Sequence, residues 1–501
     1  MELIAILLYL LLFLIPTVGL YNSWKTTKGL YAIPTIGYST PILSTWTALG
    51  VVKHAREWIA EGYSKYKGGM YKIPLLDRWL VIVTTPSAIE ELRRLPSDQV
   101  NFMGAASDTI LMKHTFGPIV HEDPFHVGII RAHLTKHLAD MFPEMFEEVT
   151  TGFKELLPEI GNDWTPVVIL PIAQKIIARA SNRIFVGLPM CRHPGYIDLS
   201  IEHTVSVTKA RKVMSGFPAF MRPLVAKWFS NAQKSVQLAI EYLGPMIEER
   251  LQKAREYGDE WTDKPNDMLQ WIIDEALAKN QDINVIATLV LATDFVSIHT
   301  SSNSFTHALY HLAANPEFIQ PLREEAEAIT TAEGWTKFSI GKLRKIDSFL
   351  RESQRMNGIG TVTVMRKALR DFRLPNGVLV PKDTILGAPT ECMHRDNEYY
   401  DNPEVFNPWR YYEMREDAEG VEGVKNQFVS TSTDYIAFGL GKHACPGRFF
   451  AANELKAMLA WVVLHYDIKF ANEGVRPPND FVFLQTYPAP GVEVLFRKRQ
   501  N

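Results

Sequence analysis

Cys445 lies in a loop whose composition lets another group approach closely. The surrounding sequence, TDYIAFGLGKHACPGRFF over residues 433–450, contains three glycines: Gly439, Gly441 and Gly447. Glycine permits backbone angles that other residues avoid, while Pro446 lacks an N–H and fixes the turn. Residues 448–466 have the apolar periodicity of a buried helix. Because a thiolate is electrostatically favoured at a helix N-terminus, we predict that this loop presents the Cys445 sulfur as a reactive group.

Two other kinds of site are not expected. The chain has three cysteines without CxxC or Cys/His ligand spacing, which predicts neither a disulfide framework nor a zinc site. Cys191 and Cys392 are expected to be inert core residues. Gly439, Gly441 and Ala444 match the GxGxxA spacing of a dinucleotide-binding turn. That turn belongs to an early βαβ unit with an acid about 20 residues later, whereas this segment lies near the C-terminus and continues into proline.

The composition indicates an enzyme-sized globular protein in a reducing compartment. The chain has 501 residues, with 53 Lys+Arg against 56 Asp+Glu and a formal net charge of -3. No dense basic run alternates with aromatic residues, so nucleic acid is not an expected partner. The sparse set of cysteines agrees with a reducing environment.

Residues 1–28 are expected to form a membrane anchor and its flank. Residues 3–24 carry no charge and are about as long as the roughly 20 residues that span a bilayer. A cleaved signal peptide, the alternative, would need a basic start, a shorter apolar core and a small-residue cleavage site. Because Lys25 and Lys28 follow the span, the positive-inside rule places the rest of the chain on the cytosolic side.

The elements that position the Cys445 loop are predicted to be mainly helical, with small β-sheets. Short β-rich runs occur at 70–76 and 79–85, and residues 126–350 are mostly helical in pattern. A further strand-like run covers 361–381, and a hairpin is expected at 480–496. The predicted fold class is therefore α+β, dominated by helices.

The loop resembles a known haem-binding segment. Phe438, Gly441, Cys445 and Gly447 reproduce the FxxGxxxCxG pattern of the cytochrome P450 monooxygenases. The resemblance extends over essentially the whole chain, so it implies the cytochrome P450 fold, with residues 29–501 as the catalytic domain. It also implies that Cys445 is the axial thiolate ligand of the iron in haem b, a ligand that favours O–O cleavage.

A second family pattern lies upstream of the loop. In FLRESQR, residues 349–355, Glu352 and Arg355 match the ExxR helix of the family, and Arg410 matches the arginine that completes its charge network. Residues three apart on a helix share one face, so the two side chains can pair. The same spacing recurs at Glu90 and Arg93, so position along the chain decides the assignment. The expected role of the network is structural.

The family's oxygen-side helix is similar to residues 285–314, which are apolar on most faces. Ser297, Ile298, His299 and Thr300 occupy the positions of its small residue, variable residue, acid and threonine. The resemblance implies that Thr300 helps to hold dioxygen and to relay protons. His299 replaces the acid, and two hypotheses remain open for it: an imidazole in a water-mediated proton relay, or a polar residue satisfied within the helix bundle.

Three residues are candidates to contact the haem propionates. His443 stands where many members of the family have arginine, and the alternative for it is a solvated loop histidine. Arg131 occupies the arginine of a WxxxR pattern whose tryptophan is replaced by Val127. Arg366 lies in the strand-like run where the family often places a propionate-binding arginine. A plain surface arginine is the alternative for Arg366.

The resemblance implies a monooxygenase of the fungal microsomal type. Its electrons would come from NADPH through a separate membrane-bound reductase, and it would be a single-pass protein of the endoplasmic reticulum membrane facing the cytosol. The expected substrate is bulky and lipophilic, a terpenoid or related secondary metabolite, and residues 103–117, 358–364 and 483–487 are expected to line its pocket. Two alternatives are a haem-thiolate isomerase or dehydratase that needs no reductase, and a non-catalytic haem protein.

Overall fold

The structure is a computed structural model that describes residues 29–500 except 76–77, 218, 375 and 417–420. The predicted anchor at residues 1–28 lies outside these residues. The α-helices are α3 Pro41–Tyr66, α4 Pro86–Arg94, α5 Phe102–Ile110, α6 Met112–Thr115, α7 Pro118–Glu122, α8 His126–Ile129, α9 Thr135–Leu156, α10 Ile169–Phe185, α11 Pro194–Met214, α12 Arg222–Phe229, α13 Ala232–Tyr257, α14 Met268–Ala278, α15 Ile283–Ala314, α16 Ile319–Glu333, α17 Lys337–Gly341, α18 Arg344–Met356, α19 Thr390–His394, α20 Arg410–Glu416, α21 Val421–Lys425 and α22 Arg448–His465. Shorter helical turns are η2 Ile130–Leu134, η3 Met190–Arg192, η4 Gly258–Glu260, η5 Pro316–Phe318 and η6 Gly441–His443. The prediction of a mainly helical fold with small sheets is confirmed.

The strands form four small sheets. Their bounds are β1 Met70–Pro74, β2 Trp79–Val83, β3 Val100–Asn101, β4 Thr165–Val168, β5 Thr363–Ala368, β6 Phe372–Arg373, β7 Leu379–Val380, β8 Ile385–Ala388, β9 Tyr466–Lys469, β10 Asn479–Val482, β11 Gln485–Pro488 and β12 Glu493–Lys498. The largest sheet has the order β1-β2-β8-β5-β3, and a second has the order β4-β12-β9. The strand pairs β10-β11 and β6-β7 are antiparallel hairpins.

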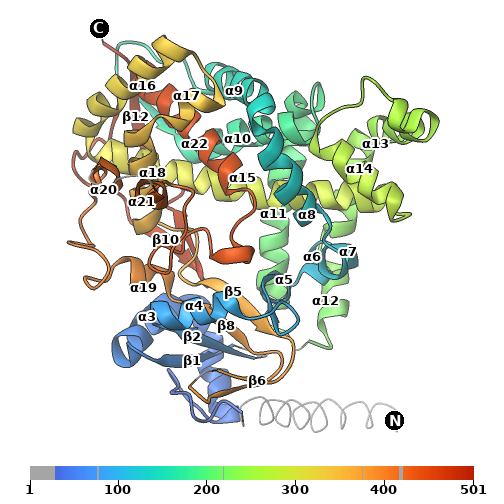
Figure 1. Ribbon diagram of the computed structural model, residues 1–501, viewed down its shortest axis with the longest axis vertical. Coiled ribbons are helices and arrows are strands. Elements are labelled where there is room, and N and C mark those ends of the chain that lie inside the picture. The colour runs from blue at the N-terminus through green and yellow to red at the C-terminus, as the bar shows by residue number, and fades with distance from the viewer. Residues whose placement is uncertain (1–28, 76–77, 218, 375, 417–420, 501) are drawn as a thin grey trace.

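Two apolar regions stabilise the fold. One surrounds the five-stranded sheet, with α3 and α4 packed at the same end of the molecule (Figure 1). The other fills the space between the helices, and α15 runs through its middle, in contact with α10, α11, α18 and α22. The Cys445 loop leads into α22, which contacts α9, α15, α16 and α18.

Helix α15 begins and ends where its sequence requires. Asp282 caps its N-terminus by accepting a hydrogen bond from the Val285 N–H, and Pro316 follows its end. Within the described residues it is the one helix that is long and apolar enough to cross a membrane. Most of its side chains are buried against other helices, so it is a core helix of this fold.

The C-terminal segment differs from the expected single hairpin. Strands β10 and β11 form the hairpin, with Val482 paired to Gln485. Strand β12 instead pairs with β4, which is far away in the sequence, and with β9. Alternating apolar residues identify a strand but not its partner, which explains the difference.

Candidate functional site

The loop before α22 holds Cys445 in a turn that depends on glycine. Gly439 and Gly441 have φ angles of 74° and 65°, in the left-handed region that favours glycine. A Cβ atom on Gly441 would lie 2.5 Å from Cγ of Arg93, so a side chain there would clash. The Cys445 N–H donates to the Phe438 carbonyl at 2.8 Å and closes the turn. The motif residues therefore shape one compact unit.

The Cys445 sulfur is accessible although it lies within the protein. The side chain is exposed, yet burial raises the pKa of its thiol. The backbone N–H groups of Gly447 and Arg448, at the start of α22, donate hydrogen bonds to the sulfur. These hydrogen bonds lower the pKa of the thiol and so oppose the effect of burial. A thiol with both properties faces an enclosed space rather than the outer surface, and a bound metal ion would displace its proton.

The other two cysteines have different surroundings. Cys191 is buried and Cys392 is partly buried. Burial raises the pKa of each thiol to about 12. Both therefore stay protonated at neutral pH, as inert core cysteines do.

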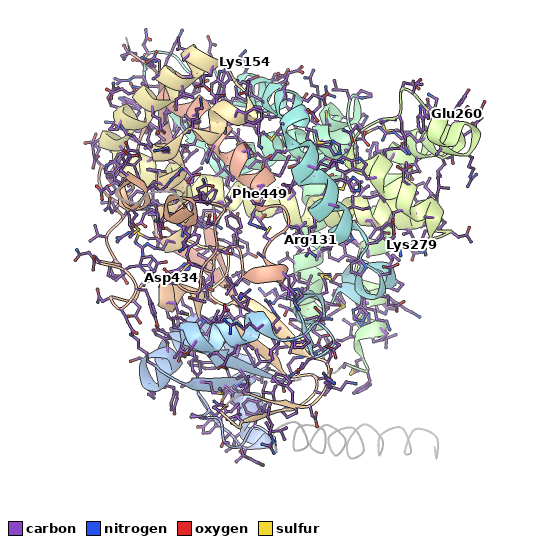
Figure 2. All side chains as sticks on the ribbon, viewed as in Figure 1. Arg131, Lys154, Glu260, Lys279, Asp434 and Phe449 are labelled. Carbon is purple, nitrogen blue, oxygen red and sulfur yellow. The ribbon has the colours of Figure 1, made fainter. Side chains whose placement is uncertain are left out.

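Cationic side chains gather beside the Cys445 loop. Arg366 on β5 is buried and donates to the Leu440 carbonyl at 3.3 Å. Arg131, labelled in Figure 2, donates to the Lys442 carbonyl at 3.2 Å. Both guanidinium groups thus contact the same loop, although they are more than 200 residues apart in the sequence. Burial lowers the pKa of Arg366 to about 10, because little solvent is left to stabilise its charge.

His443 lies within the same excess of positive charge. Its pKa is lowered to about 4, first by burial and then by the charges of Arg366, Lys442 and Arg131. In the part of the chain that the structure describes, Nε2 of His443 and Nε of Arg366 have no hydrogen-bond partner. The recorded partners of Arg131, Arg366 and Arg448 there are backbone carbonyls and no carboxylates. Unpaired donors and surplus cations fit a ligand with carboxylates, such as the two propionates of haem.

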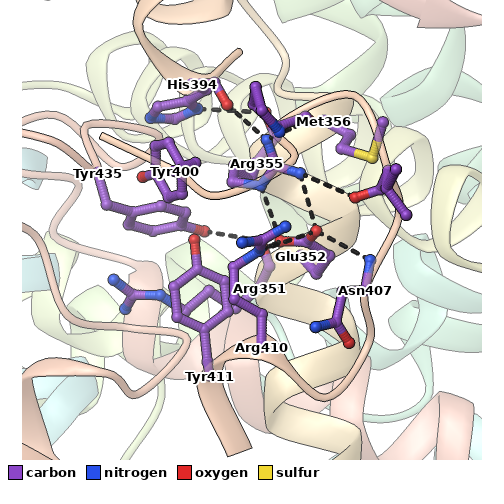
Figure 3. A network of polar contacts seen from close by, with 12 residues as sticks. Arg351, Glu352, Arg355, Met356, His394, Tyr400, Asn407, Arg410, Tyr411 and Tyr435 are labelled. Carbon is purple, nitrogen blue, oxygen red and sulfur yellow. Dashed lines mark hydrogen bonds and ion pairs between the residues drawn. The ribbon is translucent and has the colours of Figure 1, made fainter. Parts of the chain in front are cut away.

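Glu352, Arg355 and Arg410 meet in a buried charge network (Figure 3). Two nitrogens of Arg355 donate to the Glu352 carboxylate at 2.8 Å each, and Nε of Arg410 lies 3.3 Å from both of its oxygens. The Asn407 N–H adds a hydrogen bond at 3.1 Å, and Arg355 also donates to the Pro403 carbonyl at 2.9 Å. The carboxylate is thus fully paired between α18 and the segment that leads into α20, which supports a structural role.

Helix α15 is mostly buried, but several side chains in its middle are at least partly exposed. Val296 is 47% exposed there, and Ser297 and Thr300 are partly exposed. The Thr300 hydroxyl donates to the Val296 carbonyl at 2.7 Å, which leaves its oxygen lone pairs free to accept from another group. This strip of a core helix therefore faces an accessible space.

His299 points to neighbouring helices. Its Nε2 lies 3.3 Å from the Ile201 carbonyl on α11, and its Nδ1 lies 3.4 Å from the Gln174 amide on α10. Burial lowers its pKa, so the ring is neutral at pH 7. These contacts favour the hypothesis of a polar residue satisfied within the helix bundle over that of a proton relay.

Ser297 connects the accessible strip to a buried acid. Its hydroxyl lies 2.9 Å from that of Ser181, which donates to Glu454 at 3.3 Å. Burial raises the pKa of Glu454 on α22 to about 8, against the opposing effect of hydrogen bonds from Ser181 and Ser301. The sequence analysis missed this residue, although an acid within the apolar helix pattern of residues 448–466 was a signal for it.

A second buried acid lies on α15 itself. Asp294 accepts hydrogen bonds from Ser200 at 2.8 Å and Tyr196 at 3.4 Å. Burial raises its pKa to about 7. The signal for it was also present, because Asp294 is the one acidic residue in the apolar stretch 285–314.

A cavity lies between α3, α5, α11 and the turn that joins β10 to β11. Two of the three segments expected to line a pocket do so: Asp108, Thr109 and Leu111 come from residues 103–117, and Phe483 and Leu484 from 483–487. The third, 358–364, contributes no lining residue, but Met365 immediately after it does. Most of the wall is apolar, and the polar remainder is rich in arginine and lysine.

Comparison with known proteins gives a consistent result. The family model for cytochrome P450 matches residues 36–494. Cytochrome P450 monooxygenase 103 of Postia placenta is 44% identical over 99% of this chain and 98% of its own length. Cytochrome P450 monooxygenase CYP512U6 of Ganoderma lucidum is 37% identical, covering 96% and 94%. Ent-kaurene oxidase P450-4 of Gibberella fujikuroi is 30% identical, covering 95% and 94%.

Proposed function

Because this chain belongs to the cytochrome P450 family, whose members carry haem iron, we propose that it is a haem-thiolate monooxygenase that oxidises a bulky lipophilic molecule. Haem with a thiolate ligand supplies the chemistry that activates dioxygen and inserts one oxygen atom into a C–H bond. The single observation that carries the proposal is the accessible Cys445 sulfur beside cations that lack carboxylate partners.

Cys445 is assigned as the iron ligand. The backbone N–H groups of Gly447 and Arg448 would stabilise the thiolate and keep its negative charge from being fully donated to the metal. Arg131, Arg366 and His443 are assigned to the propionates, since their unused donors need acceptors.

Thr300, in the accessible strip of α15, is assigned to orient dioxygen. Its hydroxyl hydrogen is engaged by the Val296 carbonyl, so the Thr300 oxygen would accept a hydrogen bond. Ser297, Ser181 and Glu454 form a line of hydrogen-bonding groups suited to hold and pass a proton. With His299 tied to backbone and amide groups, Glu454 is the better candidate for the acid.

The substrate is proposed to be a terpenoid or a related fungal secondary metabolite. A relative named ent-kaurene oxidase and the largely apolar cavity wall support this class. The electrons are proposed to come from NADPH through a separate reductase. The protein is proposed to be a single-pass membrane protein of the endoplasmic reticulum whose catalytic domain faces the cytosol.

The reduced, carbon-monoxide-bound absorbance spectrum tests the iron ligand directly. We expect the red-shifted band of a thiolate ligand in the wild type and its loss in Cys445→Ala. The matched control is Cys392→Ala, which removes a thiol from a core position and should keep the band. A thiolate band in the Cys445→Ala variant, or a histidine-type band in the wild type, would overturn the proposal.

A further inference from the structure

The cavity between α3, α5 and α11 contains a guanidinium group whose charge is not paired. Arg211 lies near the C-terminal end of α11 and lines the cavity. Its guanidinium carbon lies 4.8 Å from the centre of the Phe483 ring, on the wall formed by the β10–β11 turn. Among the described residues, the Arg211 guanidinium contacts the Phe483 ring but forms no hydrogen bond or ion pair with a carboxylate.

The other charges of the cavity are differently placed. Asp108, the cavity's acid, is already paired with Arg78 and with Lys367, whose Nζ lies 2.7 Å from it. Arg222 donates through Nε to the Phe217 carbonyl at 3.1 Å. Asp108 is therefore committed to two other cations, and Arg211 is left as a cation that still needs an anion.

The environment of Arg211 makes an unpaired charge costly. Burial lowers its pKa, and the charge of Tyr487 acts in the opposite direction. Arg211 is half-buried, so its guanidinium loses part of its hydration without gaining a hydrogen-bonding partner. A bound carboxylate would supply two acceptor oxygens in the geometry that the planar guanidinium matches.

The rest of the cavity wall indicates what kind of molecule would carry this carboxylate. Its apolar residues include Val51, Leu75, Leu80, Met365, Ile385 and Leu484. An apolar wall favours a hydrocarbon skeleton, and Arg211, beside the exposed Lys212 that also lines the cavity, favours a negatively charged group. A purely neutral lipid would leave the Arg211 charge unsatisfied.

We propose that Arg211 recognises the carboxylate of an amphipathic substrate, so that this enzyme oxidises lipophilic carboxylic acids. The inference rests on the proposed monooxygenase function and narrows its substrate class. Neither Thr300 nor Cys445 lines the cavity, so Arg211 would not touch the reacting atoms. Arg211 is thus a specificity-determining residue rather than a catalytic one.

The test compares acids with the alcohols of the same skeleton. Dehydroabietic acid and dehydroabietyl alcohol form a rigid pair, and oleic acid and oleyl alcohol form a flexible pair. Binding to the wild-type holoenzyme is measured by calorimetry and by the ligand-induced shift of the haem spectrum. We expect at least one acid to bind about tenfold or more tightly than its alcohol, the gain typical of a charge-assisted hydrogen bond.

Variants assign the preference to Arg211. In Arg211→Gln the acid is expected to lose about tenfold or more in affinity, while the alcohol changes little. Arg211→Lys should keep part of the preference, and Lys209→Gln, the same charge change on an exposed part of α11, should keep all of it. A retained thiolate band and a retained affinity for the alcohol show that a variant is folded.

The outcomes separate this inference from the proposed function. Loss of the thiolate band in the wild type would contradict the proposed function. A normal band with equal affinity for acid and alcohol, or with no binding of either acid, would overturn the inference alone. An acid preference that survives in Arg211→Gln would also overturn it, and Arg211 would then be a packing residue for Phe483.

Discussion

At the residue scale, the proton-bearing groups near the middle of α15 are not arranged as its local sequence implies. The position before Thr300 carries His299, whose ring is held by α10 and α11. The acid that Ser297 reaches instead is Glu454 on α22, through Ser181 on α10. Proton supply would therefore depend on contacts between three helices rather than on two neighbouring residues of one.

Glu454 gives a prediction about stability and pH. Its pKa rises from an ordinary value near 4.5 to about 8 in the folded protein, mainly through burial. The folded state thus binds more protons than the unfolded state between those values, so stability falls as pH rises through that interval. The slope from one group approaches about 1.4 kcal/mol per pH unit.

We expect Glu454→Gln to remove this part of the slope between about pH 5 and pH 8. Urea unfolding at several pH values would measure it. Asp294, whose pKa is raised to about 7, is left intact in this variant and should keep its own contribution. If the pH dependence of stability is the same in Glu454→Gln and in the wild type, Glu454 is ionised in the folded protein across this pH interval, and its pKa is not raised.

The sequence identifies candidate site residues best where they lie close together in the chain. Phe438, Gly441 and Cys445 belong to one turn, so their spacing carries the geometry. Glu454 could not be assigned to the site, because its partner Ser181 lies 273 residues away in the sequence. Its apolar surroundings marked it as unusual, but only the packing of α10 against α15 and α22 identifies its contacts.

At the scale of elements, the network around Glu352 joins α18 to the segment around α20. Glu352 is fully buried and accepts from Arg355, Arg410 and the Asn407 N–H. Removing its charge would leave two buried guanidinium groups without their carboxylate, the situation that is most destabilising for a buried ion pair. The packing that carries the Cys445 loop would weaken with it.

We expect Glu352→Gln to lower the free energy of unfolding by about 3–5 kcal/mol and to reduce the haem content of the purified protein. Chemical unfolding and the ratio of haem to protein absorbance measure the two effects. The control is Glu249→Gln in α13, which removes an exposed carboxylate that pairs with Lys253 one helical turn away. Equal losses in both variants would contradict a special role for the buried network.

Elements were predicted better than their partners. The strand-like run 361–381 gave β5, β6 and β7, and the closing segment gave the β10–β11 hairpin. The pairing of β12 with β4 and β9 was not predicted, because alternation of apolar residues does not encode which edge a strand joins.

At the scale of the whole molecule, one end carries several large, exposed apolar side chains. The large exposed apolar side chains on and next to α12 are Phe220, Leu224, Trp228 and Phe229. Trp46 near the start of α3 is 71% exposed, and α3 and α12 both lie toward the sheet-bearing end (Figure 1). Exposed apolar side chains gathered on one short helix mark an interaction site, and tryptophan is favoured at the interface of a bilayer.

We therefore expect a protein truncated to residues 29–501 to keep a weaker, measurable affinity for phosphatidylcholine vesicles. In that background Trp228→Glu should reduce co-sedimentation several-fold, since it removes a side chain that is 80% exposed and places a charge at the interface. Phe338→Glu is the control, because Phe338 is 69% exposed on α17, at the far end of the molecule (Figure 1).

Equal loss in both variants would mean that vesicles bind any exposed aromatic residue. Retention of binding in Trp228→Glu would place the membrane contact elsewhere and leave residues 1–28 as the expected anchor. If Trp228→Glu alone releases the truncated protein, the bilayer lies beside the end of the molecule that holds the Arg211 cavity, since Arg222 at the start of α12 is part of its lining. An amphipathic acid could then pass from the bilayer surface to the cavity without crossing water.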